Sequence, residues 1–233
     1  MRAIILAGGK GTRLRPYTTL FPKPLVPLGG EIAVIEIIIK QLVKYNFTRV
    51  TIAVNHLSNL IKSYLGDGSQ FNIKIDYSEE KKELGTLGPL TLIKDLPKNF
   101  LVMNGDILTD LNLKNFFSIH EKNKNKVTIA TCQRKSMVNY GTLETEHGIV
   151  KKFSEKPNFN FTVSMGIFCL DRSLIKRIRK NTFLNFDKFI IKNIKSGVST
   201  INHKGLWLDI GRVEDYELAN KNFIKLKKKL WKV

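Results

Sequence analysis

Residues 3–14 read AIILAGGKGTRL, an unbroken apolar run followed at once by a glycine-rich loop. An apolar run without alternating polar residues is typical of a strand buried on both faces of a parallel sheet. Glycines after such a strand let backbone amides approach a phosphate closely. The loop is not a P-loop, because Gly11 rather than Ser or Thr follows Lys10, and Leu14 stands where a dinucleotide-binding fingerprint has its third glycine. The stretch therefore predicts an α/β fold with an anion-binding turn.

Hydrophobic periodicity extends this prediction along the chain. Strands are predicted over residues 3–7, 49–54, 73–77, 100–103, 126–131, 141–144, 149–153 and 162–170. Helices are predicted over residues 33–45, 58–65, 89–96, 113–122, 172–180, 187–195 and 213–225. Strands that alternate with helices imply right-handed crossovers and a mostly parallel sheet. We predict a single Rossmann-like three-layer α/β domain that becomes β-rich after about residue 130.

The composition is that of an ordinary folded chain with a strong positive charge. The 233 residues are 42% hydrophobic and 25% charged, and 39 lysines and arginines against 20 acidic residues give a net charge of +19. These values exclude a disordered chain, and two cysteines exclude a disulfide framework or a cysteine-rich zinc site. The charge favours anionic partners, although the basic residues are scattered as on a solvated lysine-rich surface.

Targeting and membrane signals are also weak. No apolar run approaches the roughly 20 residues that span a bilayer, and the N-terminus lacks the layout of a signal peptide. We therefore expect a cytoplasmic protein without membrane insertion. The four histidines show no metal-ligand spacing and are expected to be structural. The tail Lys225–Val233 mixes basic and apolar residues and is expected to be a frayed helix end.

Two cations stand in and after the glycine loop. Arg13 ends the loop, and Lys23 lies in the stretch FPKPL, residues 21–25. Pro22 and Pro24 restrict the backbone on both sides of Lys23, so this lysine is held as a fixed positive charge. The Arg13 guanidinium can fork across two phosphate oxygens. Together they would hold a triphosphate and the pyrophosphate that leaves it.

Two further glycine-containing turns follow predicted strands. Residues 84–90 read LGTLGPL, where glycines allow close backbone approach and the next helix start favours anions. Residues 102–106 read VMNGD and place Asp106 at the carboxyl edge of the sheet, where open α/β sheets bind ligands. A carboxylate there suits Mg²⁺, which prefers hard oxygen ligands.

In their order along the chain, these motifs resemble the sugar-1-phosphate nucleotidylyltransferase family. The resemblance is carried by GGKGTRLRPYT at 8–18, PKPL at 22–25, LGTLG at 84–88, VMNGD at 102–106, YG at 140–141, FSEKP at 153–157 and WLDIG at 207–211. It extends to about residue 223. Within the family, the sequence looks most similar to the mannose-1-phosphate and heptose-1-phosphate guanylyltransferases.

The resemblance implies a role for each motif. Arg13 and Lys23 would be catalytic, and Asp106 and Asp209 would hold Mg²⁺. The nucleotide would contact Leu6, Ala7, Gly8, Gly9, Gly11, Thr12, Glu83, Gly85, Thr86 and Gly88. The sugar phosphate would contact Tyr140, Gly141, Glu155, Lys156 and Ser164. Ser164 stands where the family often has Asn, which leaves the identity of the sugar open.

The resemblance also implies how the single nucleotidyltransferase domain, residues 1–233, is divided. Residues of about 1–130 would form the nucleotide-binding half, and residues of about 131–225 the β-rich sugar-phosphate-binding half. Because the sequence stops after the last predicted helix, no C-terminal β-helix domain is expected. The expected partners are a nucleoside triphosphate and a sugar 1-phosphate rather than nucleic acid, and a homo-oligomer stays open.

The predicted function is a Mg²⁺-dependent enzyme that forms an NDP-sugar and pyrophosphate. GTP with mannose 1-phosphate or a manno-heptose 1-phosphate is the first choice. Thymidylyl, uridylyl or cytidylyl transfer to another sugar phosphate or a phosphocholine-like acceptor stays open. Two alternatives from other classes are a non-catalytic nucleotide-sugar sensor and a basic nucleic-acid-binding protein.

Overall fold

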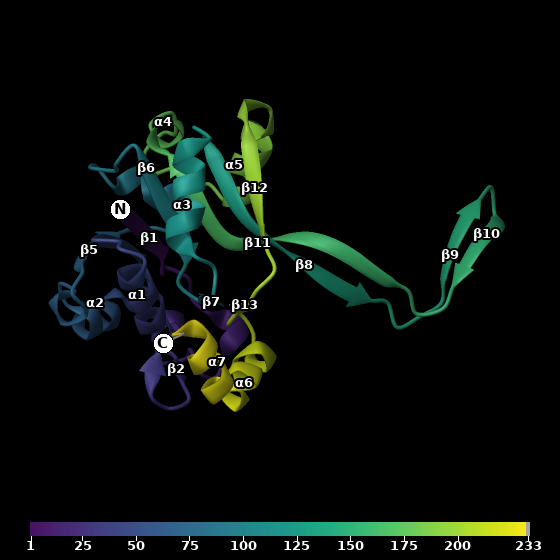
Figure 1. Ribbon diagram of the computed structural model, residues 1–233, viewed down its shortest axis with the longest axis horizontal. Helices are drawn as coiled ribbons and strands as arrows, with labels where there is room; N and C mark the ends of the chain where they lie inside the picture. Colours follow the sequence, from purple (N-terminus) through teal and green to yellow (C-terminus); the bar gives the residue numbers. More distant parts are fainter. Residues whose placement is uncertain (232–233) are drawn as a thin grey trace.

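The computed structural model describes residues 1–231 (Figure 1). Its strands are β1 (Arg2–Leu6), β2 (Pro27–Leu28), β3 (Ile32–Ala33), β4 (Arg49–Val54), β5 (Lys74–Glu79), β6 (Asn99–Asn104), β7 (Ile107–Thr109), β8 (Val127–Met137), β9 (Thr142–Glu146), β10 (Ile149–Ser154), β11 (Asn158–Asp171), β12 (Val198–His203) and β13 (Trp207–Asp209). Its α-helices are α1 (Val34–Lys44), α2 (Ser58–Leu65), α3 (Leu113–Lys122), α4 (Arg172–Ile175), α5 (Phe186–Asn193), α6 (Val213–Lys221) and α7 (Phe223–Leu230). Short 3-10 helices are η1 (Thr12–Leu14), η2 (Lys23–Leu25), η3 (Ser69–Phe71), η4 (Gly88–Leu92) and η5 (Ile194–Ser196).

A seven-stranded sheet in the order β12-β8-β11-β6-β1-β4-β5 forms the centre of the body. The apolar run at the N-terminus is its β1, which pairs in parallel with β4 and β6. Only β11 runs antiparallel to both of its neighbours within this described sheet. The predicted α/β class with a mostly parallel sheet is confirmed.

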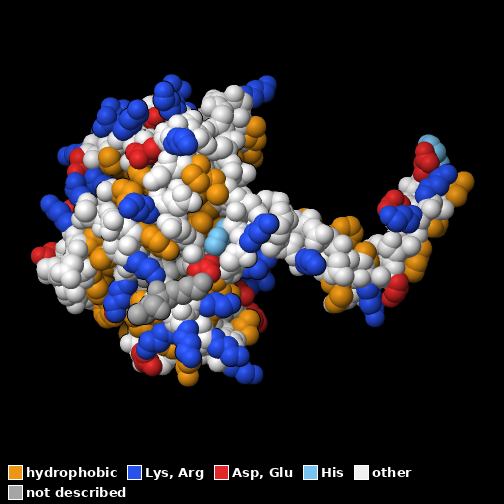
Figure 2. All heavy atoms as spheres, in the orientation of Figure 1, with side chains coloured by type: hydrophobic (Ala, Val, Ile, Leu, Met, Phe, Trp, Pro, Cys, Tyr) orange, Lys and Arg blue, Asp and Glu red, His pale blue; other side chains and the backbone are white. Residues whose placement is uncertain are grey.

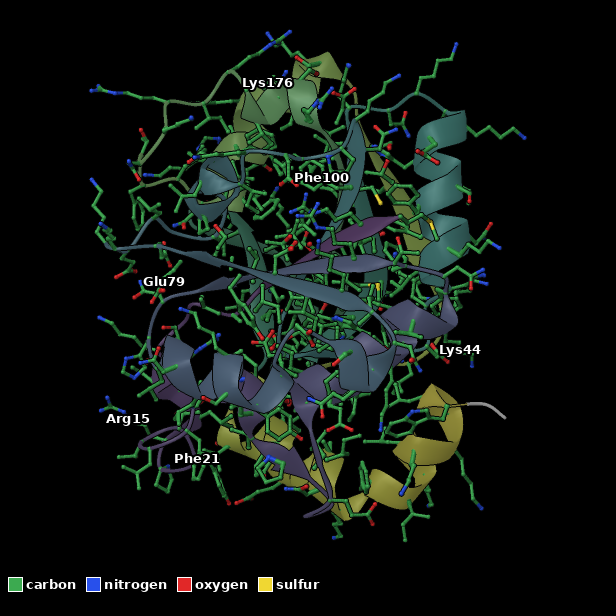
Figure 3. All side chains as sticks on the ribbon, turned by 90° about the vertical axis from the view of Figure 1, so that its left-hand side faces the viewer. Arg15, Phe21, Lys44, Glu79, Phe100 and Lys176 are labelled. Carbon is green, nitrogen blue, oxygen red and sulfur yellow. The ribbon has the colours of Figure 1, made fainter. Side chains whose placement is uncertain are left out.

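Helices cover both faces of the sheet and give three layers. On one face, Ile5 and Met103 pack with α1, α2, α3, α6 and α7. On the other face, the neighbouring residues Ile4 and Val102 pack with η4, α4 and α5. Figure 3 shows Phe100 of this second core inside the body. Because successive strand residues point to opposite faces, a continuous apolar strand supplies both cores.

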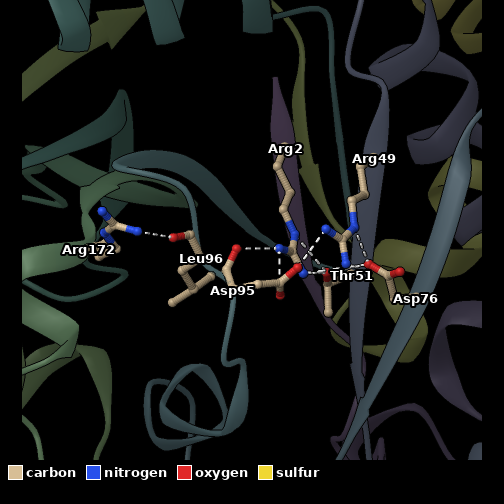
Figure 4. Close-up of polar contacts among 7 residues, drawn as sticks. All are labelled: Arg2, Arg49, Thr51, Asp76, Asp95, Leu96 and Arg172. Atoms are coloured by element: carbon tan, nitrogen blue, oxygen red, sulfur yellow. Dashed lines mark hydrogen bonds and ion pairs between the residues drawn. The ribbon is translucent and has the colours of Figure 1, made fainter.

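Ion pairs tie the amino ends of the strands together (Figure 4). Arg2 donates to Thr51 Oγ1 (3.0 Å from Nε) and to Asp95 Oδ1 (2.9 Å from Nη1). Arg49 donates to Asp76 Oδ2 (2.6 Å) and to Asp95 Oδ2 (2.7 Å). Hydrogen bonds from Arg2 and then Arg49 lower the pKa of Asp95 to about 2. This cluster fixes the edge of the sheet opposite the carboxyl ends of β1 and β4.

A long two-stranded arm leaves the body (Figure 1). We define the arm as residues 133–162. The stem of the arm consists of residues 133–137 of β8 paired with residues 158–162 of β11. The tip is the β9–β10 hairpin. The joint, which links stem and tip, consists of residues 138–141 and 155–157. β8 is buried up to Cys132 and exposed from Gln133 onward. Figure 2 shows that the arm projects from the body with hydrophobic side chains along its length.

Several predicted elements differ from the structure. The helix over 89–96 is only the 3-10 helix η4, because the residue before Pro97 disfavours helix and Asp95 is held by two arginines. The helix over 172–180 ends at Ile175, and the helix over 213–225 is broken at Asn222. The strands over 126–131 and 162–170 are longer because they also form the stem. The strand β12 was missed.

The C-terminal tail is also more ordered than expected. Residues 225–230 belong to α7, and Leu226 and Leu230 are buried in the core. The expectation of a frayed end is therefore wrong for these residues, and residues 232–233 lie outside the described part. Within residues 1–231, no helix is both long and apolar enough to cross a membrane.

Candidate active site

A cleft of about 410 Å³ opens at the carboxyl ends of β1, β4 and β6. Its lining includes Leu6, Ala7, Gly8, Gly9, Gly11, Thr12, Arg13, Lys23, Glu83, Gly85, Thr86 and Asp106. These are nearly all of the residues that the sequence assigns to the nucleotide and to catalysis. The fold brings many of them together because the glycine loop directly follows β1 and Asp106 lies just after β6, and parallel strands end at the same edge of a sheet.

The loop after β1 is shaped by its glycines. Gly11 has a left-handed φ of 64°, and its carbonyl accepts a hydrogen bond from Thr18 Oγ1 (2.7 Å). A Cβ at Gly8 would lie 2.8 Å from Glu80 Oε1, so there is no room for a side chain. The backbone itself therefore forms the wall of the cleft, where a phosphate can approach its amides.

Lys23 and Asp106 form an ion pair at the cleft. Lys23 begins η2, and its Nζ donates to Asp106 Oδ2. The two side chains are only 12% and 18% exposed. Pro22 precedes η2 and Pro24 is buried within it, so Lys23 lies between two residues whose φ is restricted.

Asp209 lies next to Asp106 although the two are far apart in the chain. β13 pairs antiparallel with β7, with Asp209 opposite Ile107, and the amide of Ile210 donates to the carbonyl of Asp106 (3.0 Å). Burial raises the pKa of Asp209, and the nearby Asp106 carboxylate raises it further, against the opposing effect of Lys23 and Arg13. The short β13–β7 ladder brings the second carboxylate beside Asp106, which lines the cleft; Asp209 itself is not a lining residue, although the nearby Gly211 is.

Each of these aspartates has an oxygen without a partner. Within residues 1–231, Asp106 Oδ1 and Asp209 Oδ1 are buried and accept no hydrogen bond. Buried carboxylate oxygens are costly unless they are paired or bind a cation. No group of three or more His, Cys, Asp or Glu residues that would hold a metal by itself occurs in the described chain. The pair therefore suits a divalent cation such as Mg²⁺, which takes one or two carboxylates and fills its remaining positions with substrate phosphate and water.

The loop at 84–90 forms another wall of the cleft. Gly85 has a φ of 75°, the amide of Thr86 donates to Asn185 Oδ1 (3.0 Å), and Thr86 Oγ1 accepts from the amide of Phe186 (2.9 Å). The loop is thus held in place by the start of α5. Gly88, also assigned to the nucleotide by the sequence, is buried instead against the backbone of Thr182.

The residues assigned to the sugar phosphate lie elsewhere. Tyr140, Gly141, Glu155 and Lys156 lie at the joint of the arm, and Ser164 lies at its root. The structure does not bring them to the cleft of their own chain, because the β8–β11 ladder continues outward past the body. It does bring the two motifs of the joint together, since a Cβ at Gly141 would lie 3.2 Å from Glu155 Oε2.

Sequence reasoning missed several polar residues of the cleft. They are Asn55 and His56 after β4, Glu80 after β5, Asn104 at the end of β6, and Asn185 before α5. Glu80 accepts from the amide of Leu84 (2.9 Å) and contacts the glycine loop, so it joins two walls of the cleft. Polar residues directly after predicted strands were a usable signal for Asn55, His56 and Asn104. Glu80 lies beyond the predicted strand 73–77, and Asn185 has no such local signal.

Comparison with known proteins shows the family to which the chain is similar. The sequence model of the nucleotidyl transferase family matches residues 2–225. The mannose-1-phosphate guanylyltransferase catalytic subunit beta of Dictyostelium discoideum is 32% identical over 225 residues. The probable mannose-1-phosphate guanylyltransferase 1 of Oryza sativa subsp. japonica is 33% identical over 227 residues. Both alignments cover 93% of this chain but only 62% and 63% of the relatives, so the chain spans less than two thirds of their length.

Solved structures share the fold. A putative glucose-1-phosphate thymidylyltransferase from Bacillus anthracis matches with a TM-score of 0.76 at 23% identity, over 95% of this chain and 94% of that chain. HddC from Yersinia pseudotuberculosis matches with a TM-score of 0.74 at 25% identity, over 95% of this chain and 99% of that chain. With a family match over almost its whole length and a glycine-walled cleft at the ends of its parallel strands, the chain belongs to the nucleotidyl transferase family.

Proposed function

We propose that the chain is a sugar-1-phosphate nucleotidylyltransferase that converts a nucleoside triphosphate and a sugar 1-phosphate into an NDP-sugar and pyrophosphate. The observation that carries the proposal is the meeting of Asp106 and Asp209, with two unpartnered oxygens, beside Lys23 and the glycine loop. A nucleotide-binding module without chemistry has no need to bury two carboxylates against each other at a phosphate site. The non-catalytic sensor is therefore the weaker candidate.

The reaction requires no covalent bond between the protein and its substrates. A phosphate oxygen of the sugar phosphate attacks the α-phosphorus, a new P–O bond forms, and the bond to the β-phosphate oxygen breaks with its electrons leaving on pyrophosphate. The attacking oxygen is already ionised near neutral pH, so no general base is required. Catalysis then rests on positioning and on neutralising charge.

Each cleft residue has a role in this scheme. The glycine loop would hold the phosphates with its amides, and Arg13 would pair with their oxygens. Lys23 would move from Asp106 to the triphosphate and stabilise the charge that develops on the leaving pyrophosphate. Asp106 and Asp209 would hold Mg²⁺, which when bound neutralises the phosphate charge. Glu155 and Lys156 would bind the sugar hydroxyls and the sugar's phosphate.

For the substrates, we propose GTP with mannose 1-phosphate or a manno-heptose 1-phosphate. The guanylyltransferase relatives at about 30% identity support the first pair. The structural neighbours named as thymidylyltransferase and HddC share only the fold at this level of identity, and Ser164 leaves the sugar open. Thymidylyl, uridylyl and cytidylyl transfer remain the alternatives to be tested.

The test is a matrix of nucleoside triphosphates against sugar 1-phosphates and phosphocholine, with Mg²⁺, scored by release of pyrophosphate. We expect the highest kcat/KM for GTP with a manno-configured 1-phosphate. A maximum for another pair would change the substrates but keep the class. No pyrophosphate release with any pair, together with salt-dependent binding of unrelated RNA on filters, would instead favour the nucleic-acid-binding class.

A further inference from the structure

The arm is incomplete as an isolated structure. Its large hydrophobic side chains are exposed: Met137, Tyr140, Leu143, Ile149, Val150, Phe153, Phe159 and Phe161, of which Tyr140 is 77% and Ile149 is 64% exposed. Its ion pairs, such as Lys152 with Glu144, are on the surface and contribute little. A two-stranded ribbon without a third layer is marginal in water, and a run of exposed apolar side chains marks a contact surface. The exposed apolar side chains of the arm therefore indicate a surface that packs against another protein surface.

The arm also holds polar groups in a defined arrangement at its joint. The first strand of the tip begins beside the last residue of the second, with Thr142 opposite Ser154. This pairing places the Gly141 backbone beside the Glu155 carboxylate, with exposed Tyr140 and Lys156 next to them in sequence. A carboxylate and an ammonium side by side can bind the hydroxyls and the phosphate of a sugar phosphate. The cleft of the body, in contrast, offers its groups to the nucleotide.

The root of the arm is fixed so that the stem points away from the body. Arg134 donates to the carbonyl of Trp207 (2.8 Å), and its guanidinium lies 4.6 Å from the centre of the Trp207 ring. The Trp207 indole in turn donates to the carbonyl of Met165 (2.9 Å), at the end of the ladder bulge. Both strands of the stem are thus clamped through one residue of β13. At about 3.3 Å per residue, the stem carries the joint more than 10 Å beyond this clamp.

The joint cannot reach the cleft of its own chain without breaking the stem. The ladder is continuous from Arg134 opposite Phe161 to Met137 opposite Asn158, and the amide of Val138 donates to the carbonyl of Pro157 (3.1 Å). A second copy of the chain has an identical cleft that lacks the same groups. In a two-fold dimer, each arm would reach the cleft of the other copy. Both arms would then have a packing surface, and both clefts would receive the sugar-phosphate-binding groups.

We propose that two copies of this chain exchange arms, so that the joint of one copy, with Glu155 and Lys156, closes the active-site cleft of its partner. The proposal rests on the proposed function, since it makes each active site a composite of two chains. The exposed hydrophobic side chains of the arm would be buried against the second copy. The occupant is a second copy rather than an unrelated protein because the arm carries the groups that its own chain's cleft requires.

The test is complementation between two inactive full-length variants. Lys23→Ala removes a cleft cation and Lys156→Ala removes a joint cation, and each variant alone is expected to have less than about 1% of wild-type pyrophosphate release. If arms are exchanged, a mixed dimer has one site with an intact cleft and an intact arm. An equal mixture, dissociated and reassembled, would then recover about one quarter of wild-type activity, because about half of the dimers are mixed and each has one complete site.

The same mixture of variants also gives the result that would contradict arm exchange. If each arm serves its own chain, every site in the mixture carries one defect, and activity stays at the sum of the two variants; that result overturns the proposal. Wild-type activity in parallel shows whether the proposed function holds, so the two failures are distinct. Melting temperatures of both variants within a few degrees of wild type would exclude misfolding as the cause of inactivity.

Sedimentation gives a readout that does not depend on activity. We expect the wild type to be a dimer, and the double variant Ile149→Ser, Phe153→Ser to shift toward monomer. The matched control is Ile191→Ser, which changes an isoleucine that is 68% exposed on α5 of the body. A monomeric wild type at assay concentration, or an equal effect of the control, would contradict arm exchange.

Discussion

Asp106 and Asp209 are held side by side by the backbone, through the hydrogen bond from the amide of Ile210 to the carbonyl of Asp106 (3.0 Å). Each carboxylate keeps one buried oxygen without a hydrogen bond. The backbone keeps the two residues adjacent, and the Asp106 carboxylate raises the pKa of Asp209 through their repulsion. Lys23 offsets part of it, and a divalent cation would offset the rest. The site is therefore built at a cost to the stability of the cation-free protein.

The first prediction concerns Asp209→Asn. Without divalent cations, the variant should melt at the same temperature as the wild type or higher, because a buried like-charge contact is removed. Mg²⁺ should raise the melting temperature of the wild type but not of the variant. Turnover should fall by about 10²–10³-fold, the loss typical of one removed electrostatic contact at a reacting centre.

Scanning calorimetry with and without Mg²⁺, together with pyrophosphate release, checks this prediction. Asp187→Asn, at an exposed position in the first turn of α5, is the control and should keep both turnover and the response to Mg²⁺. A variant Asp209→Asn that is still stabilised by Mg²⁺ as strongly as the wild type would remove Asp209 from the metal site.

The second prediction is the pH dependence of stability. Because the pKa of Asp209 is raised above its ordinary value of 3.8, the folded state binds this proton more tightly than the unfolded state. The contribution of Asp209 to stability is therefore present below pH 3.8 and is lost as pH rises through the raised pKa. Asp95 acts in the opposite direction: with a pKa of about 2, its contribution is present above about pH 4 and is lost as pH falls toward 2.

Denaturant unfolding of the wild type and of Asp209→Asn, over a pH series without divalent cations, isolates the first effect. The stability of the wild type relative to the variant should decrease as pH rises from about 4 toward neutral. A difference that is flat across this range, or that grows with pH, would show that Asp209 is not destabilised by its ionisation.

The third prediction concerns Lys23, whose replacement should strengthen metal binding but lower turnover. In the free protein, the Lys23 ammonium forms an ion pair with the Asp106 carboxylate and thus competes with a cation for it. Lys23→Met should therefore bind Mn²⁺ alone more tightly than the wild type, by several-fold, while turnover falls by about 10²–10³-fold. Titration calorimetry with Mn²⁺ and steady-state kinetics measure the two effects separately. The control Lys10→Met changes an exposed lysine of the same loop and should leave Mn²⁺ affinity unchanged. Weaker Mn²⁺ binding by Lys23→Met would contradict the competition.

The sequence was sufficient where a motif and its structural setting are local. The glycine loop follows β1 and Asp106 follows β6, so their meeting at one sheet edge was predictable from local signals, whereas the place of Lys23 in the cleft does not follow from a strand end. The position of Asp209 was expected only through family resemblance. The structure supplies the physical reason, which is a three-residue ladder between β13 and β7.

The arm could not be predicted in this way. Strands over residues 126–131 and 162–170 were expected, but how far they extend beyond the sheet depends on a ladder register and on the contact between Arg134 and Trp207. Neither the register nor this contact is indicated by a local sequence pattern. Asn185 was missed for a similar reason, because its contact with Thr86 joins segments far apart in the chain.

The last prediction separates backbone strain from its effect on the nucleotide. Gly85 has a φ of 75° and packs against Asn185 and Leu184, whereas Gly30, with a φ of 68°, has open space where a Cβ would be. Alanine at either position carries the strain of a left-handed conformation, about 1–2 kcal/mol. Gly85→Ala should be the less stable of the two, because its Cβ would clash with Asn185 Oδ1 and would lie 2.8 Å from the carbonyl oxygen of Leu184. Only Gly85→Ala also displaces a wall of the cleft, so its KM for the nucleoside triphosphate should rise about tenfold or more, while Gly30→Ala keeps the wild-type KM. Steady-state kinetics at saturating sugar 1-phosphate, with melting temperatures for both variants, make the comparison. Equal KM values in the two variants would show that the loop at 84–90 does not contact the nucleotide.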